Sequence, residues 1–439
     1  MQKTVLRVFL LALSLRAVFA IGQMIYGINN SLNFESYLYG PFNSGLELYH
    51  DFYFYYMAQL ADIHNGLIPY RDFAYSYPPL FLYSMYPFFV IGGSKAASLV
   101  IWVADAATAP LIYLAASHFT NSKLSLVAGI SYAVSPFFLL YEGYLWLSSQ
   151  PMTFFMVLSI YLLLTRRPLL SAVAFAISVL FKQELIVLVP IYVIWYLNNV
   201  PRKTLLKAIA TFSLIIFALS LPFLIISPAF YASSISYGQL GQVSLPPNYF
   251  IGTDSVSQPG NSVASHPLIC NTLSNTWRSS ICSYGNFTYT DVKLTPSWTM
   301  IFSAGFMNNI SQLIFLPLLA IALYTLVRLR RDPSMLFLSG ALALSGFLGV
   351  FTLFFHDIYR YYLIPIYIFP LVCSRTRISS SIAICIPLLS LVLPSGSIQL
   401  LLPLIDIIAV AIMNQKAIST SNQSSSDKGL PFVNYPVRG

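Results

Sequence analysis

Long apolar stretches recur along the chain from Val5 almost to Met413, and short polar segments separate them. The stretches are continuously apolar rather than alternating, which favours membrane-spanning helices over the strands of a transmembrane barrel. We therefore predict an all-α polytopic membrane protein. At about 20 apolar residues per span, about 12 transmembrane helices are expected. They lie near residues 5–26, 96–117, 125–140, 148–165, 168–182, 184–198, 207–227, 298–326, 334–355, 360–373, 378–394 and 398–413.

The composition agrees with a lipid bilayer as the main solvent. Hydrophobic residues make up 57% of the 439 residues and charged residues 8%, and the mean hydropathy is +0.72. Soluble domains carry about 25% charged residues. The net charge of +9 does not indicate nucleic acid, because the basic residues fall in small clusters between the apolar stretches. We expect the bilayer as a partner and no nucleic acid.

The basic clusters predict the orientation, because cytoplasmic loops of membrane proteins are enriched in Lys and Arg. With the N-terminus in the cytoplasm, the predicted helices place all of these clusters on the cytoplasmic side. This requires that the apolar stretch from Pro78, interrupted by Pro87, does not cross the membrane, so we interpret it as an interfacial or re-entrant helix. The clusters are Lys3 with Arg7, Arg166-Arg167, Arg202-Lys203 with Lys207, Arg328 with Arg330-Arg331, Arg375 with Arg377, and Lys416.

Residues 168–198 could form one long helix with Lys182-Gln183-Glu184 in its middle. One span would place either Arg166-Arg167 or Arg202-Lys203 outside, against the positive-inside rule. Two short helices joined at Lys182 place both clusters in the cytoplasm. We therefore predict a helical hairpin with its turn at Lys182.

We expect a single transmembrane domain over residues 1–413 and a flexible cytoplasmic tail at 414–439. The domain carries a first outer segment at 27–95, with interfacial helices, and a long outer loop at 228–297. The outer face therefore holds most of the polar residues.

Two residue pairs have expected structural roles. Cys270 and Cys282 share the long outer loop and could form a disulfide, since outer compartments permit disulfides. Asp105 and Asp406 stand inside apolar helices, where hydrogen bonds between helices are the expected role.

Aromatic and charged residues are concentrated in the first outer segment. Residues 51–64 combine helical spacing with many aromatic residues, which is typical of a helix in the headgroup layer. Asp51 begins that helix, so its carboxylate lies near the positive end of the helix dipole. The segment contains Tyr49-His50-Asp51-Phe52-Tyr53-Phe54-Tyr55-Tyr56, then Asn65-Gly66-Leu67-Ile68-Pro69-Tyr70-Arg71-Asp72-Phe73, then Tyr77-Pro78-Pro79-Leu80.

These motifs resemble those of the GT-C superfamily of polytopic membrane glycosyltransferases, in particular dolichyl- or polyprenyl-phosphate-sugar dependent mannosyltransferases. The similar features are the acid soon after the first helix, Gly-x-x-Pro-Tyr-x-Asp-Phe from Gly66, and Tyr-Pro-Pro-Leu from Tyr77. Two later segments are also similar: Phe181-Lys182-Gln183-Glu184, and the stretch from His356 to Pro365. The resemblance covers roughly residues 1–200 and 350–370. Related families carry a second acid as Asp-Pro or Gln-x-x-Asp, whereas this chain has Glu142 and Gln150-Pro151 there.

The resemblance implies a hexosyltransferase that moves a sugar from a polyprenyl-phosphate donor to a lipid-linked glycan or surface glycoconjugate on the outer face of the cell membrane, with inversion. A carboxylate takes the proton of the acceptor hydroxyl, and basic side chains stabilise the leaving phosphate. We expect no metal and no other cofactor, because the sequence has no dense cluster of Asp or His. The implied catalytic residues are Asp51 and Glu142, and the implied substrate-binding residues are His50, Arg71, Asp72, Lys182, His356 and Arg360.

Most of these assignments have a structural alternative. Asp51 could cap the interfacial helix, and Arg71 could form a local ion pair with Asp72. Lys182 could extend to the membrane interface, although charged residues at membrane depth are usually functional. His356 and Arg360 could be ordinary residues of an outer loop.

A transporter or flippase for a lipid or sugar is the alternative from another functional class. Transporters have discontinuous helices and polar residues near the middle of the membrane. Here the charged residues are concentrated at the outer ends of helices and in one long outer segment, which favours the enzyme.

Overall fold

The structure is a computed structural model. It describes residues 2–39, 52, 56–71, 75, 77–144, 146–226, 228, 231, 250–253, 267–272, 280–284, 287–290, 317, 320, 324, 332–354, 360–392 and 397–426. Only the backbone is described at 22–39, 58, 349–354, 360, 392, 397–400, 418–426 and in the strands.

The N-terminal helices carry the first outer segment between them. α1 (Gln2–Tyr39) is longer than the predicted span, and α3 (Met57–His64) lies within the predicted interfacial helix. α4 (Leu80–Ala116) has 37 residues and includes the stretch that we interpreted as a separate interfacial helix. Pro87 lies inside the helix, and the non-helical backbone at Gly92 and Gly93 separates this stretch from the rest of α4. That the stretch does not cross the membrane stays a prediction.

The next helices turn sharply near the predicted second acid. α5 (Ser122–Val134) begins after Asn121, whose side chain accepts hydrogen bonds from two backbone N–H groups of its first turn. After α5 the chain bends by 42°. It continues through α6 (Pro136–Phe138) and the π-helical turn η2 (Leu139–Tyr144) to α7 (Ser149–Leu164).

The predicted hairpin at Lys182 is confirmed. α8 (Pro168–Phe181) ends one residue before Lys182, and the chain returns through the 3₁₀ helix η3 (Gln183–Leu188) and α9 (Val189–Asn199). The hydroxyl of Tyr196 donates to the carbonyl of Pro168 at 2.7 Å, so the beginning of α8 and the end of α9 lie side by side. α10 (Arg202–Ile226) then packs against α8.

Four short strands lie within the predicted outer loop and form an antiparallel sheet in the order β1-β2-β3-β4. The strands are β1 (Phe250–Thr253), β2 (Pro267–Thr272), β3 (Ser280–Tyr284) and β4 (Phe287–Thr290). The helical fold class is therefore confirmed for the membrane part, but it missed this sheet. Cys270 stands opposite Cys282 in the register of β2 and β3, and their disulfide stays a prediction.

The C-terminal helices follow the predicted ranges. They are α15 (Pro333–Phe354), the 3₁₀ helix η6 (Arg360–Leu363), α16 (Ile364–Cys373), α17 (Arg377–Val392) and α18 (Ser397–Ser426). α18 continues helical past residue 414, where we expected a flexible tail to begin. The buried Asn414 side chain donates to the carbonyl of Cys373 at 2.9 Å and accepts from the N–H of Arg375 at 3.1 Å. The predicted helix at 298–326 lies outside the described residues, apart from three isolated positions.

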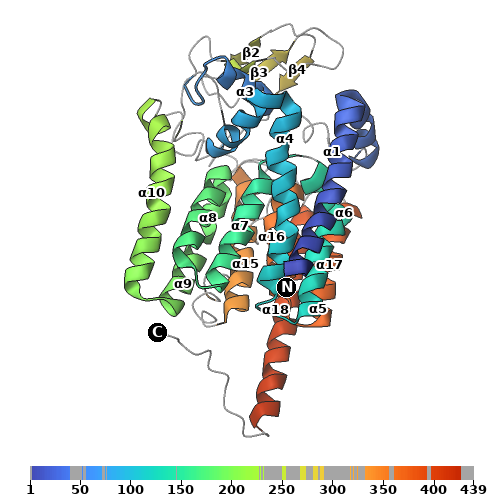
Figure 1. Ribbon diagram of the computed structural model, residues 1–439, viewed down its shortest axis with the longest axis vertical. Helices are drawn as coiled ribbons and strands as arrows, with labels where there is room; N and C mark the ends of the chain where they lie inside the picture. The colour runs from blue at the N-terminus through green and yellow to red at the C-terminus, as the bar shows by residue number, and fades with distance from the viewer. Residues whose placement is uncertain are drawn as a thin grey trace.

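The helical bundle has two distinct ends (Figure 1). The strands and α3 lie at one end, which we call the sheet end, and α1 begins toward the other. That other end contains the turns with Arg166-Arg167, Arg202-Lys203 and Arg375, and we call it the basic end. A hydrogen bond of 3.4 Å from the Thr120 hydroxyl to the carbonyl of Arg375 joins two of its turns.

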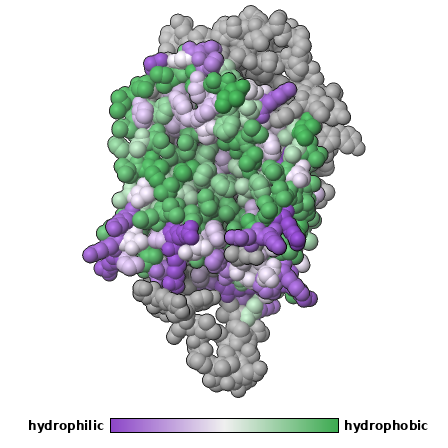
Figure 2. Space-filling model, in the orientation of Figure 1, coloured by the Kyte–Doolittle hydropathy of each residue, from purple (hydrophilic) through white to green (hydrophobic). Residues whose placement is uncertain are grey.

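The surface between the two ends is apolar, as Figure 2 shows by a broad hydrophobic band above a rim of polar residues. Among the described residues, three helices are long and apolar enough to cross a membrane: Gln2–Ile21 of α1, α4 and α10. A fourth is added if the bent pair Ser122–Val134 and Pro136–Tyr144 counts as one span. The chain is therefore a membrane protein, while the predicted number of about 12 spans is not confirmed by this criterion.

Candidate active site

The predicted site residues are described unequally. His50, Asp51, Asp72 and His356 lie outside the described residues, and only the backbone of Arg360 is described, in η6. Arg71 is exposed at the turn that follows α3. Glu142 and Lys182 are both described in full and both are buried.

Lys182 occupies the junction between two helices of different kinds. The backbone leaves α8 in an extended conformation at Lys182 (φ −158°, ψ 121°), and the 3₁₀ helix begins at the next residue. This abrupt change directs the side chain into the protein, where it is 1% exposed. The ammonium is therefore buried rather than extended to the surface, and aromatic rings cover it.

Three segments that carry the family resemblance meet at the Lys182 ammonium. Its Nζ lies 3.5 Å from the ring centroid of Tyr362, 5.2 Å from that of Tyr361 and 5.8 Å from that of Tyr77. These distances are within the range of cation–π attraction. Tyr77 comes from the first outer segment, and the other two rings follow Arg360 directly. The sequence did not predict this arrangement, because aromatic residues are frequent everywhere in the chain.

The ammonium has a charged neighbour but an incomplete set of hydrogen bonds. Nζ lies 3.2 Å from Oε2 of Glu184, which is 3% exposed. Nζ makes no hydrogen bond of good geometry with any described residue. A buried ammonium with unused N–H groups can bind an anionic oxygen strongly, since little water competes for it.

Tyr70 holds the loop that leads to Tyr77. Its hydroxyl donates a hydrogen bond to the carbonyl of Tyr77, and its backbone has a φ of 66°, which is unusual for a residue with a side chain. Its ring packs edge-on against Phe223 of α10 and against Tyr231. This turn therefore connects the first outer segment to α10 and to Tyr77, whose ring faces Lys182.

Glu142 is a second incomplete group. It lies in the π-helical turn and is 0% exposed, and neither carboxylate oxygen has a hydrogen-bond partner among the described residues. The charges of Asp105, Arg16 and Lys182 are near enough to act on it. π-Helical turns are frequently found at functional sites, and an unpartnered buried carboxylate is costly.

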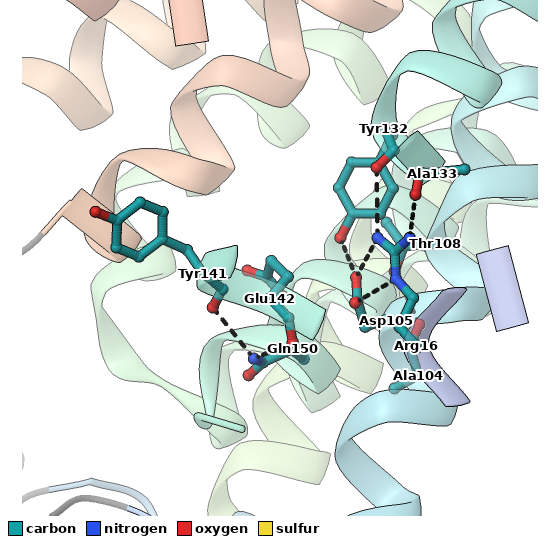
Figure 3. Close-up of polar contacts among 9 residues, drawn as sticks. All are labelled: Arg16, Ala104, Asp105, Thr108, Tyr132, Ala133, Tyr141, Glu142 and Gln150. Atoms are coloured by element: carbon teal, nitrogen blue, oxygen red, sulfur yellow. Dashed lines mark hydrogen bonds and ion pairs between the residues drawn. The ribbon is translucent and has the colours of Figure 1, made fainter. Parts of the chain in front are cut away.

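Gln150 closes the turn that carries Glu142. Its amide nitrogen donates to the carbonyl of Glu142 at 2.6 Å and to that of Tyr141 at 3.4 Å. Its amide oxygen accepts from the N–H of Leu147 at 2.8 Å. Gln150 therefore bonds to the backbone of Glu142 and leaves the carboxylate open (Figure 3).

An ion pair near Glu142 joins the first helices of the bundle (Figure 3). Nε of Arg16 lies 2.7 Å from Oδ2 of Asp105, and both side chains are 0% exposed. Oδ1 of Asp105 accepts from the hydroxyl of Tyr132 at 2.6 Å. The predicted helix-to-helix bonding of Asp105 is confirmed. Arg16 was not predicted as its partner, although a basic residue inside an apolar stretch was the available signal.

Asp406 of α18 differs from this expectation. It is 0% exposed, and neither carboxylate oxygen has a hydrogen-bond partner among the described residues. The predicted helix-to-helix hydrogen bond of Asp406 is therefore not confirmed among the described residues and stays a prediction.

The described residues contain no candidate metal-binding site. No three or more His, Cys, Asp or Glu side chains come together there in a way that could hold a metal ion. The expectation of a reaction without metal stays a prediction. What the described residues offer is an ammonium with unused donors and a carboxylate with unused acceptors.

Comparison with protein families gives a partial match. A family model described as PIG-U, GPI transamidase subunit PIG-U, matches residues 52–242. These residues include Glu142, Gln150 and Lys182, and they make up less than half of the chain. The match relates this segment to a family other than the mannosyltransferases, so mannosyltransferase specificity is not confirmed.

Comparison with solved structures gives a distant likeness. The chain is similar to the crystal structure of the Archaeoglobus fulgidus oligosaccharyltransferase in the apo form, with 13% sequence identity and a TM-score of 0.40. The match covers 93% of this chain and 55% of that one, so this chain spans about half the length of the oligosaccharyltransferase. At this TM-score the likeness carries no conclusion. No curated protein matches the chain.

Proposed function

We propose that this chain is a GT-C type membrane glycosyltransferase, a hexosyltransferase that moves a sugar from a polyprenyl-phosphate donor to a glycan or glycolipid acceptor. The observation that supports the proposal is the convergence at Lys182. The ammonium belongs to the segment Phe181–Glu184. The rings belong to two other segments that resemble the family: Tyr77 to Tyr-Pro-Pro-Leu, and Tyr361 and Tyr362 to the stretch from His356 to Pro365.

Lys182 binds the donor phosphate in this proposal. The ammonium has unused N–H groups, and a phosphate oxygen can accept from them beside the ion pair with Glu184. A buried cation stabilises the charge that develops on the leaving phosphate more strongly than an exposed one. His50, Arg71, Asp72, His356 and Arg360 are proposed, from the sequence, to bind the remaining parts of the substrates.

Two carboxylates have proposed catalytic roles. Asp51 takes the proton of the acceptor hydroxyl, and Glu142 is the second acid. Glu142 accepts hydrogen bonds from the sugar or the acceptor, because both of its oxygens are without a partner among the described side chains. No metal or cofactor takes part in the proposed reaction.

The sheet end is the outer face in this proposal. The basic clusters of the opposite end would then lie in the cytoplasm, and the transferase domain of residues 1–413 would act at the outer surface of the cell membrane. The segments 27–95 and 228–297 are proposed to cover the site, with residues 414–439 in the cytoplasm.

Transfer by the purified full chain in lipid nanodiscs tests the proposal. The donors are labelled polyprenyl-phosphate mannose, glucose and galactose, and the acceptors are lipid-linked glycans. We expect transfer of one sugar by the wild type and a loss of ~10²–10³ in kcat/KM for Lys182→Ala. Lys203→Ala, which removes an exposed cation at the basic end, is the matched control and should be unchanged.

The same assay tests the proposed base. Asp51→Asn keeps the shape and removes the basicity, so turnover should fall by at least ~10² while the donor still binds. Full turnover and full donor affinity in Lys182→Ala would overturn the phosphate assignment. With the chain reconstituted in liposomes, movement of the labelled lipid across the bilayer without cleavage would favour a transporter instead.

A second candidate is a substrate-binding subunit of a larger membrane complex. The family-model match over residues 52–242, to a family described as a GPI transamidase subunit, favours it. In that case the purified chain binds a lipid-linked glycan without transferring a sugar, and Lys182→Ala weakens binding. Purification from native membranes in mild detergent would then recover the chain in one stoichiometric assembly with other proteins.

A further inference from the structure

Glu142 lies in the π-helical turn η2, and no hydrogen bond to a described residue fixes its carboxylate. A side chain with hydrogen bonds of its own is fixed by them, but both oxygens of this carboxylate are unpartnered among the described residues. The position of the carboxylate therefore depends on the backbone of residues 139–144 and 146–148. Whatever fixes that backbone decides where the carboxylate points.

Neither of the neighbouring cations forms a hydrogen bond with the Glu142 carboxylate. Arg16 donates to both oxygens of Asp105 and to the carbonyls of Tyr132 and Ala133, and Lys182 is paired with Glu184. These charges act on Glu142 through space and do not orient it by direct bonds. Orientation must come from within the turn.

One side chain ties both sides of the turn together. The amide of Gln150 donates to the carbonyls of Tyr141 and Glu142 and accepts from the N–H of Leu147. Between these partners, Trp146 has a φ of 42°, a conformation that costs free energy and persists only when surrounding contacts impose it. We propose that Gln150 is a positioning residue that holds Glu142 as an open, buried carboxylate for the ligand.

The function of this arrangement rests on the proposed role of Glu142, while the arrangement itself can be tested without any transfer. Gln150→Leu removes these hydrogen bonds and a further one of 3.5 Å that the Ser149 hydroxyl donates to the same amide oxygen. Gln150→Glu keeps the acceptor oxygen and removes the amide donors. Ser159→Ala is the matched control, because it removes a buried hydrogen bond of 2.9 Å to the carbonyl of Ser171 elsewhere on α7.

The first measurement is backbone hydrogen exchange and carbodiimide labelling of the peptide 139–148 in nanodiscs. We expect exchange to rise on the order of 10-fold in Gln150→Leu, with several-fold faster labelling of Glu142 by dicyclohexylcarbodiimide. Gln150→Glu should give a smaller change of the same sign, and Ser159→Ala none. Unchanged exchange and labelling in both Gln150 variants would overturn the inference, whether or not the chain transfers sugars.

The second measurement separates positioning from general stability. If Gln150 acts through Glu142, Gln150→Leu should lower kcat by up to ~10² with little change in KM, and the double variant with Glu142→Gln should be no slower than the slower single variant. Multiplicative losses in the double variant would overturn the positioning role. Absence of transfer by the wild type would overturn the proposed function alone, because the exchange and labelling results would still stand.

Discussion

Two buried ion pairs in this protein differ in how completely they are satisfied. Arg16–Asp105 joins α1 to α4 at 2.7 Å, and Lys182–Glu184 lies at the turn after α8 at 3.2 Å. Both pairs are almost fully buried. The guanidinium and carboxylate of the first pair are surrounded by further hydrogen bonds, whereas the ammonium of the second is surrounded by aromatic rings.

The difference is consistent with a structural role for the first pair and with the binding role that we propose for the second. A buried ion pair offsets its desolvation cost only when additional hydrogen bonds satisfy the remaining donors and acceptors. Arg16–Asp105 meets this condition and can hold helices together. Lys182–Glu184 does not meet it within the described structure, which is the condition of a site that completes its bonds with a ligand.

The largest expected effect on stability is at the complete pair. Arg16→Met leaves the Asp105 carboxylate buried without its counter-ion, so we expect a loss of about 3–5 kcal/mol in the free energy of unfolding. The double variant Arg16→Met/Asp105→Leu should recover most of this loss. Equilibrium unfolding in mixed detergent micelles measures both. A single variant as stable as the wild type would break the comparison.

A smaller effect is expected at the hydroxyl that completes the pair. Tyr132→Phe removes the hydrogen bond of 2.6 Å to Asp105, and hydrogen bonds to charged groups contribute about 1.5–3 kcal/mol. The same substitution in an Asp105→Leu background should cost almost nothing, because the acceptor is absent. Equal losses in the two backgrounds would show that the hydroxyl does not act through Asp105.

The smallest expected effect is at the ring that covers the incomplete pair. Tyr362→Leu removes the nearest cation–π contact of Lys182, and we expect a loss of about 0.5–2 kcal/mol in the free energy of unfolding. Tyr361→Leu is the matched comparison. It should lower the free energy of unfolding by less, since the ring centroid of Tyr361 is 5.2 Å from Nζ and that of Tyr362 is 3.5 Å from it. A larger loss at Tyr361 would mean that packing, and not the cation, decides the result.

The sequence was sufficient for the helices that a periodic or continuous apolar pattern defines. The sequence also placed the turn at Lys182. Arg166-Arg167 and Arg202-Lys203 both favour the cytoplasmic side, so the chain must cross the membrane an even number of times between them. In α4 the sequence indicated an interruption at Pro87, whereas Pro87 is accommodated within the helix and the break lies at Gly92 and Gly93.

The contacts of the site were less predictable. The cover of Lys182 by Tyr362 and the open carboxylate of Glu142 depend on tertiary packing between segments far apart in the chain. A π-helical turn has no simple sequence pattern, and Gln150 was noted only as a departure from the family motif. Arg16 was visible as a charge at membrane depth, but its partner could be identified only in three dimensions.

The break in α4 divides the helix into two parts whose lengths can be compared with the thickness of a bilayer. At 1.5 Å per residue, the helix of 37 residues would be ~55 Å long, which exceeds the ~30 Å of a hydrocarbon core. The part that follows Gly93 is ~35 Å long and matches that thickness by itself. The part before the break is ~18 Å long and still exposes apolar side chains such as Ile91, which is 83% exposed. Gly92 and Gly93 therefore divide α4 into one part that is long enough to cross a hydrocarbon core by itself and one that is not.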